Sequence, residues 1–528
     1  MTSYTDADSN TATTTYDLSG RVATTDDGKG TRTYTYDGGS EKRGLATSVV
    51  DSQVGTFSSG IYDADGTLTS QTWPNGVGVT TTYDETGAAS GLTYTMTGCG
   101  QADCTLYDES VQQSTHGQQR NHASTLSSQT YTYDNAGRLL NTTETVDGQC
   151  TTRVYAFNLA SDRTSLATYA PAADGGCQVS TGTTVNVSYD TADRLAGNGY
   201  VYDSLGRTST APANATGIPV GGDLTATYYV TDYIRSLSQA GRTTTYDLDV
   251  LSSRVRSWTD SDGSTTTSRT HHYADDSDSP TWTDESGGIA SRVVRSLDGM
   301  AAITAADVAD SVMWQINNLH NDVVGSIDNA SMLPSSFGES TEYGQPRNAD
   351  EVGSRRYGWL GAEQRAADTP SGAMLMGRRV YLPATGRFLS TDPVFGGSAN
   401  SYDYSNQDPV NMVDLDGQRA RRSPGAGSCG ALSLVRKHAL ARSMAEKCMK
   451  FVRNPDPVWI YRTRKWMVGC GKIFLVGGAS ATGGNLITNI FRNWAGKKLI
   501  SLYGGWYGLV GSLLWACVGA TWSGSLKW

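Results

Sequence analysis

The stretch YTYDNAGRLL, Tyr131–Leu140, decides the fold. Tyr131 and Tyr133 are separated by one residue, so in a strand both side chains would lie on the same face. The next four residues, Asp134–Gly137, form a turn sequence, because Asp and Asn side chains bond the local backbone and Gly137 tolerates a positive φ. The stretch therefore predicts a β-hairpin: a strand ending in Tyr-Asp, a turn ending in Gly, then Arg and a return strand.

The same Tyr-Asp pattern recurs along the first half of the chain. Its tyrosines are Tyr16, Tyr36, Tyr62, Tyr83, Tyr133, Tyr189, Tyr202 and Tyr246. One hairpin is too small to fold alone, so the repeats are expected to stack into one continuous sheet. The composition, with 60 Gly and only 14 Pro, is typical of a mainly β protein with tight turns.

The charge is divided sharply along the chain. The whole sequence has 42 Lys and Arg against 52 Asp and Glu, yet residues 419–528 have 17 Lys and Arg against two acids, Glu446 and Asp456. Such a split indicates two parts with different tasks. The first residues, MTSYTDADSN, have neither a basic start nor an apolar run, so neither a signal peptide nor a membrane anchor is expected there.

The cysteines leave two interpretations open. Cys99 and Cys104 bracket a short loop, and Cys150 and Cys177 bracket a segment that reads as two strands. Both pairs suit disulfides and an oxidising destination, or they are four unrelated thiols. No His or second Cys pair stands at ligand spacing, so neither a metal site nor a cofactor is expected.

The repeats resemble those of the YD-repeat, or Rhs, proteins, over most of the chain before Gly417. The element HNDVVGS, with His320, is similar to a family wall element, which favours a structural His320 over a catalytic one. The stretches RYGWLGAEQ and GRRVYLPATGRFLSTDP resemble the end of the Rhs core, with matching residues Arg379, Tyr381, Gly386, Arg387, Phe388 and Asp392. The resemblance implies a hairpin ribbon wound into a hollow shell around a C-terminal toxin: a shell over 1–385, a core end with an autoprotease motif over 386–418, and a toxin domain over 419–528.

The family's core end is an aspartyl autoprotease with two Asp-Pro motifs. Asp392 lies 22 residues before Asp414, which is the family's spacing, and the resemblance implies cleavage between Gln418 and Arg419. Two carboxylates held close together cannot both ionise, so one acts as an acid while the other activates water. Arg387 is an additional candidate for this site.

This sequence departs from the family motif in three places. Leu415 stands where the family has Pro, Gln418 stands where it has Leu, and the glycines of the first motif are displaced to Gly396 and Gly397. The alternative interpretation is that Asp392 and Asp414 are turn formers like the aspartates of the repeats. Two further carboxylates compete for the assignment, those of Asp408 and Asp416.

The C-terminal part reads as a small, mainly helical domain that is both basic and hydrophobic. A basic amphipathic stretch, 431–454, precedes two uncharged runs, Ile473–Phe491 and Leu499–Leu526. The shorter run would span roughly 28 Å as a helix, near the thickness of a bilayer core. Aromatic ends and a Gly-x-x-x-Gly motif suit packed membrane helices. The candidates for membrane insertion are Ile473, Phe491, Leu499, Gly504, Gly508, Leu513 and Trp522.

We therefore expect a membrane-inserting toxin that its own shell releases, secreted or delivered to a target-cell membrane. The resemblance also implies a cognate immunity protein and a delivery partner. One alternative is a nucleic-acid-acting toxin, which the basic charge equally suits, although only His438 offers a general base there. The other is a structural or adhesive cell-surface repeat protein without toxic activity, against which the basic, non-repeat C-terminal part argues.

Overall fold

The structure is a computed structural model, and it describes residues 2–96, 104–197, 199–249, 254–306, 308, 311–329 and 334–423. All of these residues belong to one compact unit, residues 1–431. The basic C-terminal part beyond Ser423, with all seven candidates for membrane insertion, lies outside the described residues. Among those that are described, no helix is long and apolar enough to cross a membrane.

The described chain forms an antiparallel β-ribbon divided into several sheets, and within each sheet every strand pairs with its neighbours in sequence. The first sheet has sixteen strands: β1 (Ser3–Thr5), β2 (Thr11–Tyr16), β3 (Val22–Asp26), β4 (Thr31–Tyr36), β5 (Ala46–Asp51), β6 (Gly55–Tyr62), β7 (Leu68–Thr72), β8 (Val77–Tyr83), β9 (Ala89–Met96), β10 (Cys104–Gln113), β11 (Gln119–Ser124), β12 (Ser128–Tyr133), β13 (Leu139–Val146), β14 (Gln149–Phe157), β15 (Arg163–Tyr169) and β16 (Gly182–Asn186). A two-stranded sheet follows, made of β17 (Ser188–Tyr189) and β18 (Leu195–Ala196).

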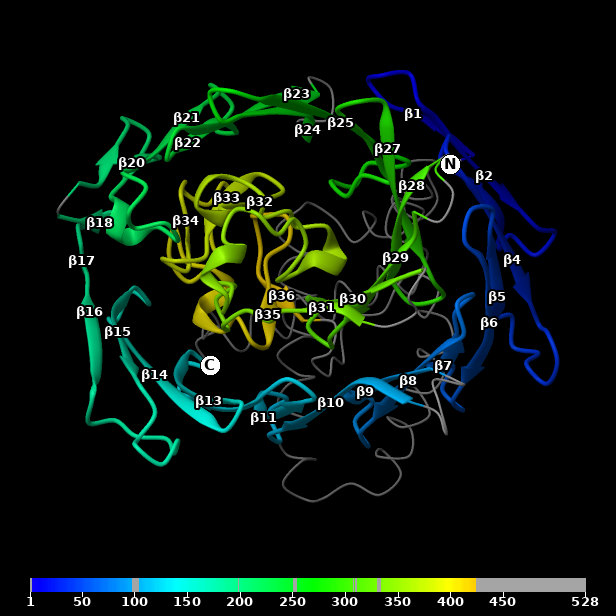
Figure 1. The fold of residues 1–528 in the computed structure, drawn as a ribbon, viewed down its shortest axis with the longest axis horizontal. Coiled ribbons are helices and arrows are strands. Elements are labelled where there is room, and N and C mark those ends of the chain that lie inside the picture. The colour runs from blue at the N-terminus through cyan, green and yellow to red at the C-terminus, as the bar shows by residue number, and fades with distance from the viewer. Residues whose placement is uncertain are drawn as a thin grey trace, which may run out of the picture. The chain divides into compact units, whose positions relative to one another are not determined.

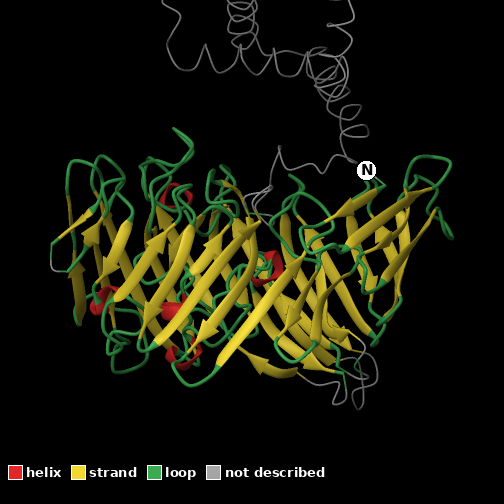
Figure 2. Ribbon diagram, turned by 90° about the horizontal axis from the view of Figure 1, so that it is seen from above, coloured by secondary structure: helices red, strands yellow, loops and turns green. Residues whose placement is uncertain are grey.

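A second large sheet continues the ribbon. Its thirteen strands are β19 (Val201–Tyr202), β20 (Thr208–Ala211), β21 (Leu224–Tyr228), β22 (Ile234–Gln239), β23 (Arg242–Asp249), β24 (Arg254–Ser261), β25 (Thr266–His272), β26 (Trp282–Glu285), β27 (Ile289–Arg295), β28 (Met300–Ala306), β29 (Met313–Asn317), β30 (Val323–Asp328) and β31 (Pro334–Phe337). Figure 2 shows the strands side by side between two rims, with the turns along the rims. We call residues 2–337 the wall.

The Tyr-Asp hairpin forms as the sequence predicts. Between β12 and β13, Asp134 Oδ1 accepts the backbone N–H groups of Ala136 and Arg138 at 2.8 and 3.0 Å. Gly137 has φ +88°, a left-handed conformation that glycine adopts without strain. The Arg138 guanidinium returns to the same carboxylate, with Nε 2.7 Å from Asp134 Oδ2. The repeated Asp, Gly and Arg are therefore all parts of one turn.

At several hairpins, the Tyr that ends the first strand links the hairpin to the one before it. The Tyr36 hydroxyl, at the end of β4, donates to the carbonyl of Val22, the first residue of β3, at 2.8 Å. The same bond joins Tyr83 to Leu68, Tyr189 to Arg163, Tyr202 to Leu195 and Tyr228 to Thr208, at 2.8 to 3.1 Å. Each acceptor is the first residue of a return strand. A chain of such bonds holds the repeats in register, so the Tyr is a connector as well as an apolar side chain.

One of the predicted repeats is wrong. Tyr246 and Asp247 lie inside β23, which continues to Asp249, and they form no turn. No Gly follows them at the turn position, so the backbone stays extended. Tyr246 is instead fully buried and stacks on Trp258 with ring centroids 5.8 Å apart. Tyr246 is therefore part of the hydrophobic core and not of a Tyr-Asp turn.

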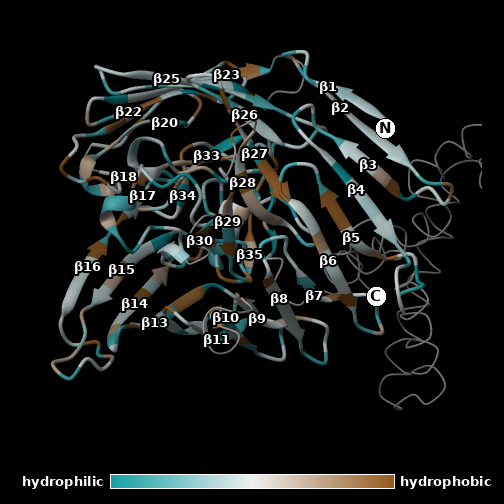
Figure 3. Ribbon diagram, turned by 45° about the vertical axis from the view of Figure 1, so that its right-hand side comes forward, coloured by the Kyte–Doolittle hydropathy of each residue, from teal (hydrophilic) through white to brown (hydrophobic). Residues whose placement is uncertain are grey.

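The wall closes by overlap. Figure 1 shows β27–β30 lying inside the curve of the early strands β4–β8. Phe57, Trp73 and Trp314 pack together there, with ring centroids 5.8 to 6.4 Å apart, and Figure 3 shows apolar stretches on β5 and β27 in the same region. Arg292, fully buried, joins Asp27 at 2.7 Å and Asp51 at 2.9 Å. Side chains, and not backbone pairing, therefore fasten the second sheet to the first.

Residues 338–423 lie within the curve of the wall (Figure 1). They include the predicted autoprotease segment, 386–418, and from here on we call the whole of 338–423 the core end. They contain short strands and single 3₁₀ turns: η2 (Ala349–Glu351), η3 (Gly361–Glu363), η4 (Pro370–Gly372), β32 (Met374–Met376), β33 (Arg379–Leu382), β34 (Arg387–Phe388), η5 (Ser405–Gln407), β35 (Met412–Val413) and β36 (Arg421–Arg422). One further turn, η1 (Ala213–Ala215), belongs to the wall. The interior of the curve is thus filled in part by the chain's own segment.

The disulfide question is settled for one pair. Cys150 and Cys177 are bonded to each other, with Cα atoms 4.8 Å apart, and they join the start of β14 to the β15–β16 connection. Cys104 is disulfide-bonded as well, and Cys99 lies outside the described residues. Of the two interpretations that the sequence left open, the structure has the disulfide at Cys150 and Cys177, which suits an oxidising compartment.

Candidate active site at the end of the core

Asp392 and Asp414, 22 residues apart in sequence, meet at one arginine. Arg379 Nη2 lies 3.1 Å from Asp392 Oδ2 and 3.1 Å from Asp414 Oδ2. Arg379 begins β33, Asp392 follows β34, and Asp414 follows β35, so three short strand ends bring the group together. Asp414 is fully buried, and the Arg379 side chain is 1% exposed. The predicted carboxylate pair is therefore adjacent, and a buried cation holds it.

The peptide bond between Gln418 and Arg419 lies against Asp414. The backbone N–H groups of Gln418 and Arg419 donate to Asp414 Oδ1 at 3.0 and 3.1 Å. Both also donate to Asp416 Oδ1, at 3.1 and 3.3 Å. The nitrogen that a cut after Gln418 would release is thus within hydrogen-bond distance of one member of the pair.

The carbonyl side of the same peptide bond faces Gly397. A Cβ atom on Gly397 would lie 2.1 Å from the Gln418 carbonyl oxygen and 2.9 Å from Asp392 Oδ2. Only glycine leaves room for the Gln418 carbonyl at this distance. Because the same Cβ position would also contact Asp392, the Asp392 carboxyl and the Gln418 carbonyl lie on the same side of Gly397. The glycine that is displaced from the expected motif therefore has a physical role here.

Burial sets the protonation of the site. It raises the pKa of the Asp414 carboxyl to about 6, with Arg379 opposing the rise and Asp416 adding to it. Burial likewise raises the pKa of Asp403, 0% exposed, to about 6, and it lowers the pKa of the Arg379 guanidinium. Near neutral pH, Asp414 therefore exchanges a proton readily, as a general acid must.

Asp392 is held in a different way from Asp414. Its Oδ1 accepts the backbone N–H of Val394 at 2.8 Å, and its Oδ2 accepts the Ser398 hydroxyl at 3.0 Å as well as Arg379. Asp414 also accepts three donors, namely Arg379 and the N–H groups of Gln418 and Arg419. The two carboxyl groups therefore differ in what they face: Asp392 binds its own loop, whereas Asp414 binds the peptide after Gln418.

Two other sequence candidates lie away from the pair. Arg387 binds the wall: its Nη1 lies 3.0 Å from Asp162 Oδ1, and its Nη2 donates to the Asp193 carbonyl. It therefore does not lie at the candidate site. Asp408 is buried and accepts Asn411 Nδ2 at 2.7 Å. Arg379 is the residue that sequence reasoning missed. It is among the residues that match the end of the Rhs core, but only its contacts with Asp392 and Asp414 show that it lies at the site.

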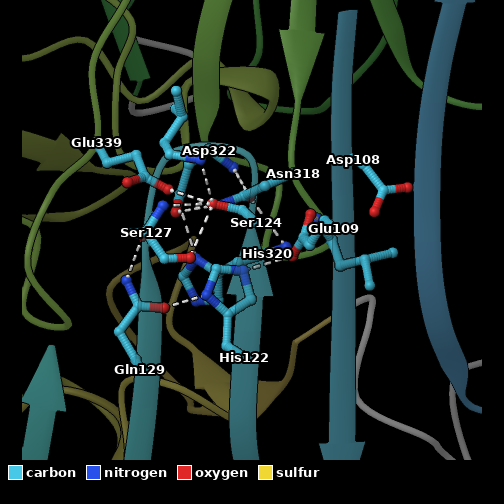
Figure 4. Close-up of polar contacts among 12 residues, drawn as sticks. Asp108, Glu109, His122, Ser124, Ser127, Gln129, Asn318, His320, Asp322 and Glu339 are labelled. Carbon is cyan, nitrogen blue, oxygen red and sulfur yellow. Dashed lines mark hydrogen bonds and ion pairs between the residues drawn. The ribbon is translucent and has the colours of Figure 1, made fainter. Parts of the chain in front are cut away.

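His320 belongs to a second polar cluster, between the wall and the core end (Figure 4). Its Nδ1 lies 2.9 Å from Asp322 Oδ1, and its Nε2 donates to the Pro409 carbonyl at 3.0 Å. Burial disfavours a charged ring, but Asp322 and these hydrogen bonds outweigh it, so the pKa of His320 is raised. Nearby, His122 Nε2 lies 3.1 Å from Glu109 Oε1. A cavity of about 70 Å³ adjoins both histidines. The bond from His320 to the Pro409 carbonyl joins the wall to the core end, whereas the His122–Glu109 pair joins neighbouring strands of one sheet.

Comparisons with known proteins agree with the fold. Solved structures that contain TcdB2 and TccC3 are similar: the complex with Cdc42 has a TM-score of 0.59 at 17% identity over 78% of this chain and 22% of that one. A Photorhabdus luminescens Tc holotoxin pore gives 0.61 at 16% identity over 81% and 22%. The chain therefore has the fold of part of a Tc toxin chain and spans about a fifth of that chain's length.

The sequence comparisons cover a smaller part of the chain. The tRNA nuclease WapA of Bacillus subtilis strain 168 is 32% identical over 108 residues, which are 19% of this chain and 4% of that protein. The tRNA(Glu)-specific nuclease WapA of Bacillus subtilis subsp. natto gives the same identity and coverage. No family profile matches the chain.

Proposed function

We propose that this chain is a Rhs-type toxin whose core end cuts the chain between Gln418 and Arg419 and so frees a C-terminal toxin domain from its β-wall. The observation that carries the proposal is the contact of Asp414 Oδ1 with the Arg419 nitrogen, 3.1 Å, beside a second carboxylate on the same arginine. The Tc toxin fold of the wall and the WapA match support it. As part of this proposal we keep the domain limits expected from the sequence, 1–385, 386–418 and 419–528, although the hairpin sheets themselves end at Phe337.

The geometry suggests a role for each carboxylate. Asp392, which lies beside Gly397 with the Gln418 carbonyl, takes a proton from water, which adds to the carbonyl carbon. In the structure Arg379 occupies Asp414 Oδ2, and Oδ1 accepts the Arg419 N–H, so Oδ1 is the oxygen that faces the nitrogen. Once water has added, the nitrogen carries a lone pair, and Oδ1 can deliver the Asp414 proton to it. As the C–N bond breaks, that proton passes to the nitrogen. The products are a carboxyl group on Gln418 and a free α-amino group on Arg419.

The site is tested by a pair of matched variants. Asp414→Asn should leave one full-length chain, because an amide cannot supply the proton. Asp416→Asn is the control, since Asp416 touches the same two peptide N–H groups, and Asn keeps an acceptor oxygen for them. Equal cutting in both variants would show that Asp414 has no special role, and loss in both would show that Asp416 is required as well.

For the freed domain we propose membrane insertion, in a target cell reached by secretion or delivery, with an immunity protein in the producer. Its support is the pair of uncharged runs, Ile473–Phe491 and Leu499–Leu526. A nuclease is the second candidate, favoured by the WapA names and the excess of positive charge. Producing Arg419–Trp528 in bacteria while following membrane potential and tRNA integrity together separates the two: the first should fall and the second should stay intact.

A further inference from the structure

The residues just after the proposed cut form a strand. β36, Arg421–Arg422, pairs with β35, with Met412 opposite Arg422 and Val413 opposite Arg421. The pairing extends to Ser423, whose N–H donates to the Asn411 carbonyl at 2.8 Å and which is only 2% exposed. The chain is thus held by backbone bonds on the far side of the peptide that would be cut.

Further contacts surround this strand. Arg421 forms an ion pair with Asp416, and the Ala420 N–H donates to the Gly397 carbonyl at 3.4 Å. Arg422 Nη2 donates to the His116 carbonyl of the wall at 3.4 Å. None of these contacts depends on the bond between Gln418 and Arg419, so hydrolysis would leave them in place.

The partner of the strand is itself fixed to the wall. Asn411 Oδ1 accepts the Gln119 N–H at 2.8 Å, and its Nδ2 donates to the Tyr133 hydroxyl at 2.9 Å. β35 is therefore a firm edge, and backbone pairing to such an edge is a common way of binding an extended peptide.

Hydrolysis would also strengthen the contact between the Arg419 nitrogen and Asp414. The Arg419 nitrogen, 3.1 Å from Asp414 Oδ1, would become an α-amino group, which takes a second proton near neutral pH. An ammonium beside a buried carboxylate forms a charge-assisted hydrogen bond, stronger than the amide contact that it replaces. The cut end would be bound at its first nitrogen and along its backbone.

We infer that the core end is also a product-binding site, which keeps Arg419–Ser423 paired to β35 after the cut. Its ligand is a short basic peptide strand with a free α-amino group, here the new end of the chain's own C-terminal part. The inference rests on the proposed cut. Its consequence is that cutting and release are separate steps: release requires β36 to peel away from β35.

A cysteine pair across the strands tests this in the full chain. Met412→Cys with Arg422→Cys places two thiols at directly opposite positions, where a disulfide fits. The purified double variant is first checked for cutting by intact mass, then treated with a mild oxidant, and the linked peptides are identified by mass spectrometry. The same pair with Asp392→Asn added is the uncut reference.

The expected result is a cut chain in which oxidation joins the two pieces, with the same yield as in the uncut reference. Linkage in the reference but not in the cut chain would overturn the inference and leave the cutting intact. Absence of linkage in both would overturn the strand pairing itself. A double variant that is never cut, together with an uncut wild type, would instead reject the proposed cut.

A second pair of variants adds the backbone as a test. Ser423→Pro removes the N–H that bonds Asn411, whereas Ser423→Ala removes only the hydroxyl. In the cut cysteine-bearing chain, the proline should lower the linkage yield several-fold, and the alanine should leave it unchanged. Equal yields in the two would show that the strand is not held by its backbone.

Discussion

The backbone nitrogen of Arg419 lies 3.1 Å from Asp414 Oδ1, and the other oxygen of that carboxyl lies 3.1 Å from Arg379, which also binds Asp392. This relationship brings a buried carboxyl, a second carboxyl and one half-exposed peptide bond together. The turns of the wall also contain such a pair, Asp17 and Asp37 on Arg21, so the peptide bond beside Asp414, and not the shared arginine, distinguishes this site. Burial raises the pKa of Asp414, which gives the site a pH dependence.

Cutting should slow as the pH rises through about 6. Burial raises the pKa of Asp414 to about 6, so the carboxyl carries its proton below that value and loses it above. A general acid acts only in the protonated form. The check is the cutting rate of freshly synthesised chain, shifted to buffers from about pH 5 to about pH 8 and followed on a gel. A rate that rises across this range would mean that Asp414 acts as the base.

Trp314→Ala should weaken the closure of the wall. Trp314 is 2% exposed and contacts Phe57 and Trp73 of the first sheet. Removing a buried Trp costs about 3 to 5 kcal/mol, so the urea midpoint should fall clearly. Leu18→Ala is the control, because Leu18 is fully exposed at a turn and should change little. Equal midpoints for the two variants would show that the overlap contributes nothing.

His320→Gln should destabilise the fold more at low pH than at high pH. The pKa of His320 in the folded protein is above its ordinary 6.5, since Asp322 outweighs burial. Its stabilisation is therefore complete below about pH 6.5 and disappears as the pH rises through the folded value. The measurement is the difference in Tm between wild type and variant across pH, with His116→Gln as the exposed control. A difference that grows with pH would contradict the charged pair.

Leu513→Asp should abolish toxicity if the C-terminal part inserts into membranes. An Asp at the centre of a membrane helix costs about 2.5 to 3.5 kcal/mol on insertion scales. Leu513→Ala is the matched control and should keep most of the activity, and His438→Ala should do little. Dye release from anionic liposomes by each variant is the direct readout. Toxicity that survives Leu513→Asp but is lost in His438→Ala would favour the nuclease.

The hairpins could be read from the sequence because each turn is local: Asp134, Gly137 and Arg138 lie within five residues of one another. The overlap of the second sheet on the first could not be predicted from the sequence. It depends on pairs such as Arg292 and Asp51, which are 241 residues apart, and no local pattern marks such pairs. Tyr246 shows where the local pattern fails. The Tyr-Asp dipeptide is present there, but no Gly follows at the turn position, so the dipeptide stays within a strand.

The site was predictable in part. The spacing of Asp392 and Asp414, with the Rhs resemblance, indicated the pair and the peptide bond after Gln418. It could not indicate Arg379 or the clearance at Gly397, because each depends on how strand ends meet in space. Arg387 was the arginine chosen from the sequence, and the fold uses it to fasten the core end to Asp162 of the wall.

The most direct test of the central claim is the intact mass of the purified chain beside that of Asp392→Asn. Wild type should give two masses, those of Met1–Gln418 and Arg419–Trp528, under denaturing conditions, and Asp392→Asn should give one. A single full-length mass for wild type, a cut at another bond, or two masses that persist in Asp392→Asn would contradict the account.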